Sequence, residues 1–303
     1  MFIKGVGERR SVSFDSTTQK LTFIDQRKLP ASVVFFEAVT LKEVISCIEN
    51  MIVRGAPAIG ISAAWGMAIG IKEGYSPMEA ARLIKASRPT AKDLFYAVDF
   101  LLKEINRGRD PVEIAREYEE MIVEKCRQIS INGSMLIKDG MNILTHCNAG
   151  ALATGDWGTA LGCIRYAWKE GRKLFVYVDE TRPRLQGAML TSWELMNENI
   201  PHAVIPDNAA GYYMWKKKID MVITGADNIA ANGDVANKIG TYEKAVLAKE
   251  NNIPFYVAAP ASTFNMSLKS GDEITVEERS ENEVHYIHDR RITPEGAVAL
   301  NPA

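Results

Sequence analysis

The chain has 303 residues, and at roughly 150 residues per domain this length suggests about two domains. Lysine plus arginine total 36 and aspartate plus glutamate total 38, so the formal net charge is −2 at pH 7. A charge this balanced argues against bulk electrostatic binding to nucleic acid or to an anionic membrane. The hydrophobic fraction of 47% and the charged fraction of 24% exclude an intrinsically disordered chain.

The cysteines point to a reducing compartment. Cys47, Cys126, Cys147 and Cys163 are scattered, and none forms a CxxC pair, which argues against a disulfide framework and against a zinc ribbon. The four dispersed histidines do not form a metal-ligand pattern either. The first residues lack the apolar segment of a signal peptide, so we expect a cytoplasmic protein.

The first 130 residues predict a small, mostly helical domain with a short antiparallel sheet. Alternating apolar residues predict a hairpin over 10–14 and 20–24, and a third strand over 31–36. Apolar residues at helical spacing predict helices over 41–53, 77–86, 91–106 and 111–129.

Residues 55–71 form an uncharged run of 17 residues, at the lower limit for a membrane span. The run is rich in glycine and alanine, is closed by Arg54 and Lys72, and has Pro57 where a helix would begin. We therefore predict a tightly packed buried helix, with no membrane crossing.

Residues 131–303 alternate short apolar runs with helical segments. Strands are predicted over 142–147, 173–178, 202–206, 220–226 and 254–259, with helices near 158–170, 182–198, 209–217 and 238–251. This alternation indicates βαβ units and a parallel sheet. The predicted fold class is α/β: a small, mostly helical N-terminal domain (1–130) and a Rossmann-like catalytic domain (131–303).

Polar or reactive side chains follow four of these predicted strands. Cys147, Asp179, Asp207 and Asp227 come at or directly after strand ends. Because ligands bind at the carboxyl edge of an open parallel sheet, we expect a site there. Aspartate also favours turns and helix caps, so any one of these residues alone has a structural explanation.

Cys147 differs from the other cysteines in its surroundings. It precedes a glycine-rich loop that leads into a helix, where backbone N–H groups and the helix dipole lower the pKa of a thiol. An inert strand-end cysteine is the alternative. His146 is adjacent, but neighbouring residues of a strand face opposite sides, so we expect its side chain to pack elsewhere. The GxGxxG and GxxxxGK[ST] patterns are absent from the sequence.

Several cationic and amide groups suggest an anionic, oxygen-rich ligand. Arg54 with Gly55 and Ala56 forms an anion cradle at a predicted helix start. Further candidates are Arg88 (with Pro89 and Thr90), Gln186, Asn237 and Lys238. Each of these groups alone is more often a solvated surface or cap residue.

Long motifs in this sequence resemble the methylthioribose-1-phosphate isomerase family. They are RGAPAIG, SRPTAKDLF, THCNAGALAT, YVDETRPRLQGA, DNAAGYYM, GADNIAANGDVANKIGTY and IPFYVAAPASTF. That family comprises the aldose–ketose isomerases of methionine salvage, a part of methionine biosynthesis, and is related to ribose-1,5-bisphosphate isomerase and to the regulatory subunits of initiation factor 2B. The similarity extends from about residue 25 to the C-terminal NPA.

The resemblance implies an intramolecular oxidoreductase that converts 5-methylthioribose 1-phosphate to 5-methylthioribulose 1-phosphate. It implies that Cys147 and Asp227 are the catalytic pair. It implies substrate contacts from Arg54, Gly55, Ala56, Arg88, Gln186, Asn237 and Lys238. It also implies a homodimer that needs no metal and no organic cofactor.

Two other functions fit the same sequence. One is isomerisation of another sugar 1-phosphate, such as 5-deoxyribose 1-phosphate. The other is a non-catalytic regulatory role like that of the initiation-factor subunits, against which the intact motifs around Cys147 and Asp227 argue. Asn228 stands where many members of the family have arginine, which adds weight to a substrate without the methylthio group. Members also usually continue past NPA, so we expect either a truncated chain or a missing terminal segment.

Overall fold

The computed structural model describes residues 1–89 and 91–303. Near the N-terminus, β3 (Val12–Asp15), β4 (Lys20–Ile24) and β5 (Phe35–Ala38) form an antiparallel sheet in that order. Leu21 and Phe23 of β4 face the helical core, since alternate side chains of a strand lie on the same face. A short ribbon of β1 (Phe2–Ile3) and β2 (Gly7–Glu8) precedes the sheet.

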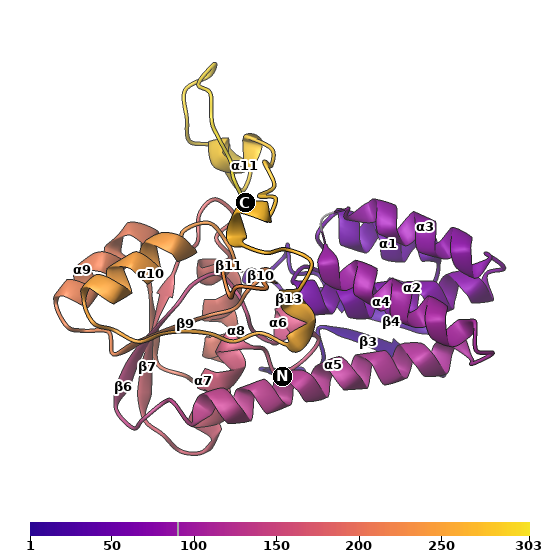
Figure 1. Ribbon diagram of the computed structural model, residues 1–303, viewed down its shortest axis with the longest axis horizontal. Coiled ribbons are helices and arrows are strands. Elements are labelled where there is room, and N and C mark those ends of the chain that lie inside the picture. Colours follow the sequence, from indigo (N-terminus) through magenta and orange to yellow (C-terminus); the bar gives the residue numbers. More distant parts are fainter. Residues whose placement is uncertain (90) are drawn as a thin grey trace.

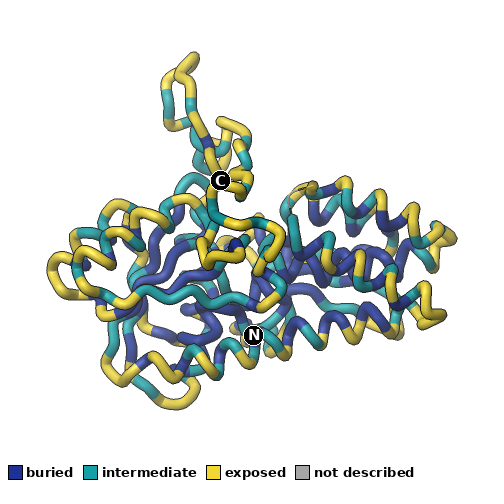
Figure 2. Tube along the Cα trace, viewed as in Figure 1, coloured by how far each residue is buried: buried dark blue, intermediate teal, exposed yellow. Residues whose placement is uncertain are grey.

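Helices pack around one central helix in this part of the chain (Figure 1). They are α1 (Leu41–Glu49), α2 (Ala56–Lys72), α3 (Pro77–Ser87), α4 (Lys92–Ile105) and α5 (Pro111–Ser134). Helix α2 contacts the other four, and its residues are buried almost throughout, as the dark tube in Figure 2 shows. The uncharged run is therefore a core helix, as predicted. Within the described part of the chain, no helix has both the length and the apolar character needed to cross a membrane.

The second half contains a five-stranded parallel sheet in the order β12-β9-β6-β7-β8. Its strands are β6 (Met141–Thr145), β7 (Leu174–Asp179), β8 (His202–Ile205), β9 (Met221–Thr224) and β12 (Phe255–Val257). The accompanying helices are α6 (Ala151–Thr154), α7 (Ala160–Lys169), α8 (Ser192–Asn197), α9 (Ala210–Trp215) and α10 (Thr241–Glu250), with a π-helical turn at Gly187–Thr191 before α8. The α/β fold with a Rossmann-like parallel sheet is confirmed.

Two smaller features follow the sheet. The strands β10 (Asn228–Ala230), β11 (Val235–Ala236) and β13 (Phe264–Asn265) form a second sheet. The chain then ends in a projecting segment that contains α11 (Asn282–His285), β14 (Tyr286–Ile287) and β15 (Arg290–Arg291) (Figure 1). Short 3-10 turns lie at Asp207–Ala209, Ala261–Thr263 and Gly271–Glu273.

Helix α5 joins the two halves. It packs against α2 on one side and against α7 on the other, and Figure 1 shows it running along both regions. The predicted domain boundary after residue 130 falls inside this helix. The division into two domains stays a prediction.

Some predicted bounds were wrong. The third strand lies at Phe35–Ala38 and not at 31–36, and α5 continues to Ser134. The helical segment predicted from 182 begins only at Gly187, because the preceding loop contains residues with positive φ, Thr181 and Leu185. The helix predicted from 238 begins at Thr241, so Asn237 and Lys238 lie in the loop before it.

Candidate active site

The carboxyl ends of the parallel strands bring the predicted reactive residues to one edge of the sheet. Cys147 follows β6, Asp179 ends β7, and Asp207 follows β8. Asp227 follows β9, which is hydrogen-bonded to β6. This arrangement arises because neighbouring parallel strands end at the same edge.

Cys147 lies in a constrained turn and is partly exposed. Its φ of 64° is in the left-handed region, which residues other than glycine seldom adopt. Its N–H donates to Thr181 Oγ1 at 2.9 Å, and its carbonyl accepts from Thr191 Oγ1 at 2.7 Å. Burial raises the pKa of the Cys147 thiol, while the positive charges of Arg54 and Lys238 oppose that rise.

Asp227 lies within the influence of the same cations. Desolvation of its carboxyl by the surrounding protein raises the pKa of Asp227, and the positive charges of Lys238, Arg54 and Arg88 oppose that rise. The residue itself is exposed, so its carboxyl is only partly desolvated. Its N–H donates to the Ala236 carbonyl at 2.9 Å, which ties the turn after β9 to β11.

Arg54 is held against the loop that contains Cys147. One guanidinium nitrogen donates to the Asn148 carbonyl at 3.2 Å, and another donates to Asn148 Oδ1. The third guanidinium nitrogen, Nε, is buried without a hydrogen-bond partner among the described residues. A buried donor without a partner carries a desolvation cost, and an anionic ligand would remove that cost.

The start of α2 lies directly beside this arginine. Gly55 is the N-cap with φ of 94°, and no side chain caps the first turn, which begins with Ala56. The backbone N–H groups at the start of a helix favour a negatively charged ligand. Gly55 packs so closely on α6 that a Cβ there would lie 2.5 Å from the Cβ of Ala153.

The other predicted contact residues are distributed around this centre. Arg88 ends α3, and burial together with the charge of Arg279 lowers the pKa of its guanidinium. Gln186 is 7% exposed, and its Oε1 is buried without a partner among the described residues. The Asn237 amide donates to Thr241 Oγ1 at 3.0 Å. Thr90, which the sequence interpretation grouped with Arg88, lies outside the described residues.

A cavity of about 570 Å³ adjoins the site through Arg54 and Gln186. It lies between the loop at 183–190 and the projecting C-terminal segment, and it is lined by Gln26, Arg27, Met51, Arg54, Pro183, Arg184, Leu185, Gln186, Met189, Leu190, Asn282, Glu283, Tyr286, Ile287 and His288. Two of its arginines are already paired, Arg27 with Asp25 and Arg184 with Glu283, each at 2.8 Å. Neither Cys147 nor Asp227 lines the cavity.

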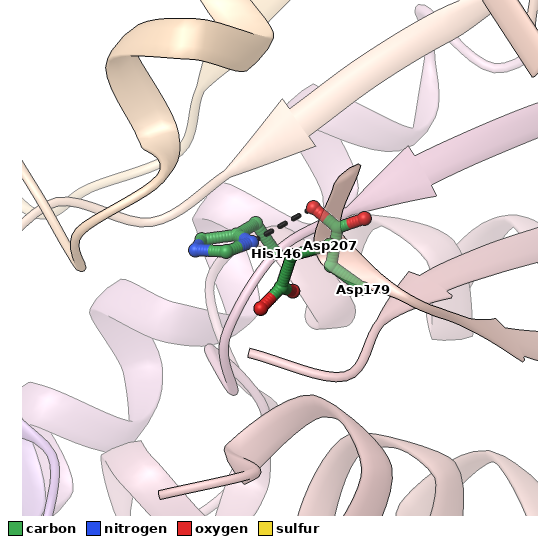
Figure 3. Close-up of side chains that lie close together, drawn as sticks. All are labelled: His146, Asp179 and Asp207. Atoms are coloured by element: carbon green, nitrogen blue, oxygen red, sulfur yellow. Dashed lines mark hydrogen bonds and ion pairs between the residues drawn. The ribbon is translucent and has the colours of Figure 1, made fainter. Parts of the chain in front are cut away.

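A second cluster includes His146, the residue before Cys147: potential metal-ligand atoms of His146, Asp179 and Asp207 lie within 4.8 Å of one another (Figure 3). The His146 nitrogens contact Asp179 Oδ2 at 2.8 Å and the Ile239 carbonyl at 2.7 Å. The Asp207 oxygens accept from the N–H groups of Thr181 and Arg182, both at 2.7 Å. Both His146 nitrogens, both Asp207 oxygens and Asp179 Oδ2 already have partners, so the cluster is arranged as a hydrogen-bonded network and not as an open cation site. Asp179 Oδ1 is buried without a partner among the described residues. As predicted, the His146 side chain packs in the interior.

The sequence interpretation missed Glu194. This residue is 4% exposed and accepts hydrogen bonds from the Asn148 amide at 2.9 Å and from the Ala151 N–H at 2.8 Å. It therefore anchors the same asparagine that holds Arg54, together with the start of α6. The available signal was a glutamate between the apolar residues Trp193 and Leu195 of α8, since carboxylates are seldom fully buried without partners.

Comparison with known proteins agrees with this fold. The Initiation factor 2 subunit family matches residues 52–303. A methylthioribose-1-phosphate isomerase from Thermotoga neapolitana is 50% identical to this chain over an alignment of 307 residues. The alignment covers 97% of this chain and 90% of that protein. The crystal structure of 5-methylthioribose 1-phosphate isomerase from Pyrococcus horikoshii has a TM-score of 0.89 at 39% identity, covering 98% of this chain and 87% of that one.

A structure from A. fulgidus carries a different name, translation initiation factor eIF-2B, subunit delta. Its TM-score is 0.87 at 38% identity, and the match covers 98% of this chain and 90% of that one. Both names thus occur among close structural relatives. The chain belongs to the initiation factor 2 subunit family and, within it, to the family of methylthioribose-1-phosphate isomerases.

Proposed function

We propose that this protein is an aldose–ketose isomerase that converts 5-methylthioribose 1-phosphate to 5-methylthioribulose 1-phosphate in methionine salvage. The observation that carries the proposal is that Cys147 and Asp227 lie at one edge of the sheet. The positive charges of Arg54 and Lys238 act on both of these side chains. A thiol and a carboxyl beside cations suit proton transfer on a phosphorylated sugar.

The proposed roles follow the geometry. Cys147 and Asp227 are the catalytic pair. The phosphate and the sugar hydroxyls are bound by Arg54, the N–H groups of Gly55 and Ala56, Arg88, Gln186, Asn237 and Lys238. The unpartnered atoms Arg54 Nε and Gln186 Oε1 support this assignment, because a ligand with both acceptors and donors would satisfy them.

The reaction has one unusual requirement. Phosphate on C1 prevents spontaneous opening of the sugar ring to an aldehyde, so the enzyme must open it. Asp227, whose pKa is raised, donates a proton to the ring oxygen as the C1–oxygen bond breaks. Hydrogen then moves from C2 to C1, either as a proton taken by the Cys147 thiolate and returned to C1 or as a hydride shift. The C2 hydroxyl gives its proton back to the Asp227 carboxylate as the ketone forms.

An isotope distinguishes these two routes. A substrate carrying deuterium at C2 should lose part of its label to water if Cys147 takes the proton. Complete retention of deuterium at C1 would exclude the proton route. A hydride shift would instead require a dry, apolar site.

The cavity bears on the 5-substituent of the substrate. Its wall contains Met51, Leu185, Met189 and Leu190, and thioether and aliphatic side chains pack well against a methylthio group. A second phosphate would need free cations, whereas Arg27 and Arg184 are paired. These features support a sugar monophosphate with an apolar 5-substituent.

A deoxy sugar 1-phosphate remains the second candidate, because Asn228 replaces the arginine common in the family. Its Oδ1 is buried without a hydrogen-bond partner among the described residues. The test is kcat/KM measured side by side for the two sugar phosphates. We expect a preference for the methylthio substrate of about 10-fold or more, since a small apolar group in a pocket contributes about 1–3 kcal/mol. An equal or reversed preference would contradict the assignment.

A regulatory role without catalysis is distinguished by the same assay, since such a protein would convert neither substrate.

We further propose a cytoplasmic homodimer. All four cysteines are free thiols, as in a reducing compartment. Val298 and Leu300 of the projecting segment are 85% and 80% exposed, which is typical of a surface that a second subunit covers.

A further inference from the structure

His146 connects two segments that are far apart in the sequence. It follows β6 and precedes Cys147, and its side chain is 1% exposed. One ring nitrogen faces Asp179 at the end of β7, and the other faces the carbonyl of Ile239 in the loop before α10 (Figure 3). The ring is therefore held on both sides.

The hydrogen-bond partners fix where the protons lie. A carbonyl only accepts hydrogen bonds, so His146 Nε2 carries a proton and donates it to Ile239. The proton between Nδ1 and Asp179 Oδ2 is shared by a ring and a carboxyl that is fully buried. Lys244 Nζ lies 3.5 Å from the same oxygen with a side chain that is 0% exposed. Asp207 and Glu243 are the other charged groups at this cluster.

The Ile239 carbonyl directly follows Lys238 in the chain. Lys238 is the cation whose charge acts most strongly on the pKa of Asp227, and it also acts on Cys147. Gly240, next in sequence, has φ of 98°, and a Cβ there would lie 3.0 Å from the His146 ring. The loop thus bends tightly around the histidine, so a movement of the ring moves the loop.

We propose that His146, oriented by Asp179, is a positioning residue that holds Lys238 beside Cys147 and Asp227 through the Ile239 carbonyl. The proposal deepens the proposed function, because it says what places the cation at that site. A buried ion pair with only a structural role would stabilise the fold without setting the electrostatics at Cys147.

The rate of Cys147 alkylation by iodoacetamide, measured against pH without substrate, tests this directly. Burial raises the pKa of the Cys147 thiol, and the charged groups that act on it are Arg54 and Lys238, which lower it, and Asp227, which raises it. The other three cysteines are buried, and burial raises the pKa of each thiol to about 12, so the modification reports on Cys147. Because no sugar phosphate is used, failure here is distinct from failure of the proposed reaction.

Two substitutions form a matched pair. Glutamine in His146→Gln places an amide nitrogen near the position of Nε2 and keeps a donor for Ile239. Asparagine in His146→Asn places it near Nδ1, so the contact with Asp179 is kept and the contact with Ile239 is lost. We expect His146→Asn and Lys238→Met each to raise the alkylation pKa by about 1 unit, and His146→Gln to leave it near the wild-type value.

In the double variant His146→Asn/Lys238→Met, the alkylation pKa should shift no further than in Lys238→Met alone, since both substitutions remove the same effect of Lys238 on the thiol. Fully additive shifts, or a wild-type pKa in His146→Asn, would overturn the proposal. Mass spectrometry detects unfolding, since an unfolded chain is alkylated at all four cysteines. If His146→Asn unfolds, Gly240→Ala pushes the loop away from the His146 ring, because the added Cβ would lie 3.0 Å from that ring, and should raise the same pKa. An unchanged value would also overturn the proposal.

Discussion

Cys147 illustrates how single residues shape the proposed site. Its left-handed backbone is held from both sides by threonine hydroxyls, those of Thr181 and Thr191. Thr181 also has positive φ, at 65°. Unfavourable backbone conformations persist where surrounding contacts enforce them, and they concentrate at functional sites. The strain at Cys147 thus supports the assignment of a role to its thiol.

Asp93 gives a prediction about stability at the same scale. Burial raises the pKa of this carboxyl, which is 4% exposed, to about 6 from an ordinary 3.8. The folded state therefore binds the proton more tightly than the unfolded state, and this contribution to stability is lost as the pH rises from about 4 to 6. Asp93→Asn cannot ionise and avoids that loss.

We expect the free energy of unfolding of Asp93→Asn, relative to the wild type, to rise by up to about 3 kcal/mol between pH 4 and pH 7.5. Urea unfolding at the two pH values measures it. Asp289 is exposed, and Asp289→Asn is the control. The difference between its free energy of unfolding and that of the wild type should be the same at both pH values. A difference for Asp93→Asn that does not depend on pH would contradict the interpretation.

Part of the site was predictable from the sequence at the level of residues. The placement of Cys147 and Asp227 at one sheet edge could be predicted because neighbouring parallel strands end at the same edge, whereas their catalytic roles stay a prediction. Glu194 was not found, because its role depends on hydrogen bonds to Asn148 and Ala151, more than 40 positions away in the chain. Such contacts leave no local pattern in the sequence.

Among the elements, the start of α2 is sensitive to substitution at Gly55. Gly55→Ala would put a methyl group against α6 and force a positive φ on a residue with a side chain. Gly74, just beyond the end of the same helix, has φ of 99° and no atom within 4 Å of a Cβ. The two glycines therefore separate the cost of the backbone conformation from the cost of the clash.

We expect Gly74→Ala to lower the free energy of unfolding by about 1 kcal/mol, and Gly55→Ala to lower it by about 3 kcal/mol or more. Urea unfolding measures both. Gly55→Ala should also lower kcat/KM, because α6 continues the loop that holds Arg54. Equal losses of stability for the two variants would show that the contact with Ala153 has no energetic importance.

Most elements could be predicted from their periodicity, and the errors have a common cause. Short apolar runs located the strands β6, β7 and β9, which are buried along most or all of their length and therefore read as nearly continuous apolar segments. The starts of α10 and of the π-helical turn at Gly187–Thr191 were placed too early, since positive φ values in the preceding loops are set by tertiary contacts. The sheet of β10, β11 and β13 was missed because its strands have only two or three residues.

At the scale of the whole molecule, the projecting C-terminal segment makes few contacts with the body beyond its base. There, Arg184 pairs with Glu283 and Arg182 donates to the Val284 carbonyl at 2.9 Å. Figure 2 shows much of the segment as exposed. An extended segment with exposed apolar side chains is best explained by contact with another subunit.

Light scattering coupled to size-exclusion chromatography tests this. The chain has a mass of 33.6 kDa, and we expect the particle to have twice that mass. Val298→Asp combined with Leu300→Asp should shift the particle towards the monomer if the segment forms the interface. A wild-type monomer at micromolar concentration would contradict the proposed homodimer.

The central claim is catalysis of sugar-phosphate isomerisation by Cys147 and Asp227. Its most direct test is the conversion of 5-methylthioribose 1-phosphate, followed by nuclear magnetic resonance, with the wild type, Cys147→Ser and Asp227→Asn. We predict formation of the ketose by the wild type and a loss of kcat by about 10²-fold or more in each folded variant. No conversion by the wild type, or variants that turn over as fast as the wild type, would contradict the claim.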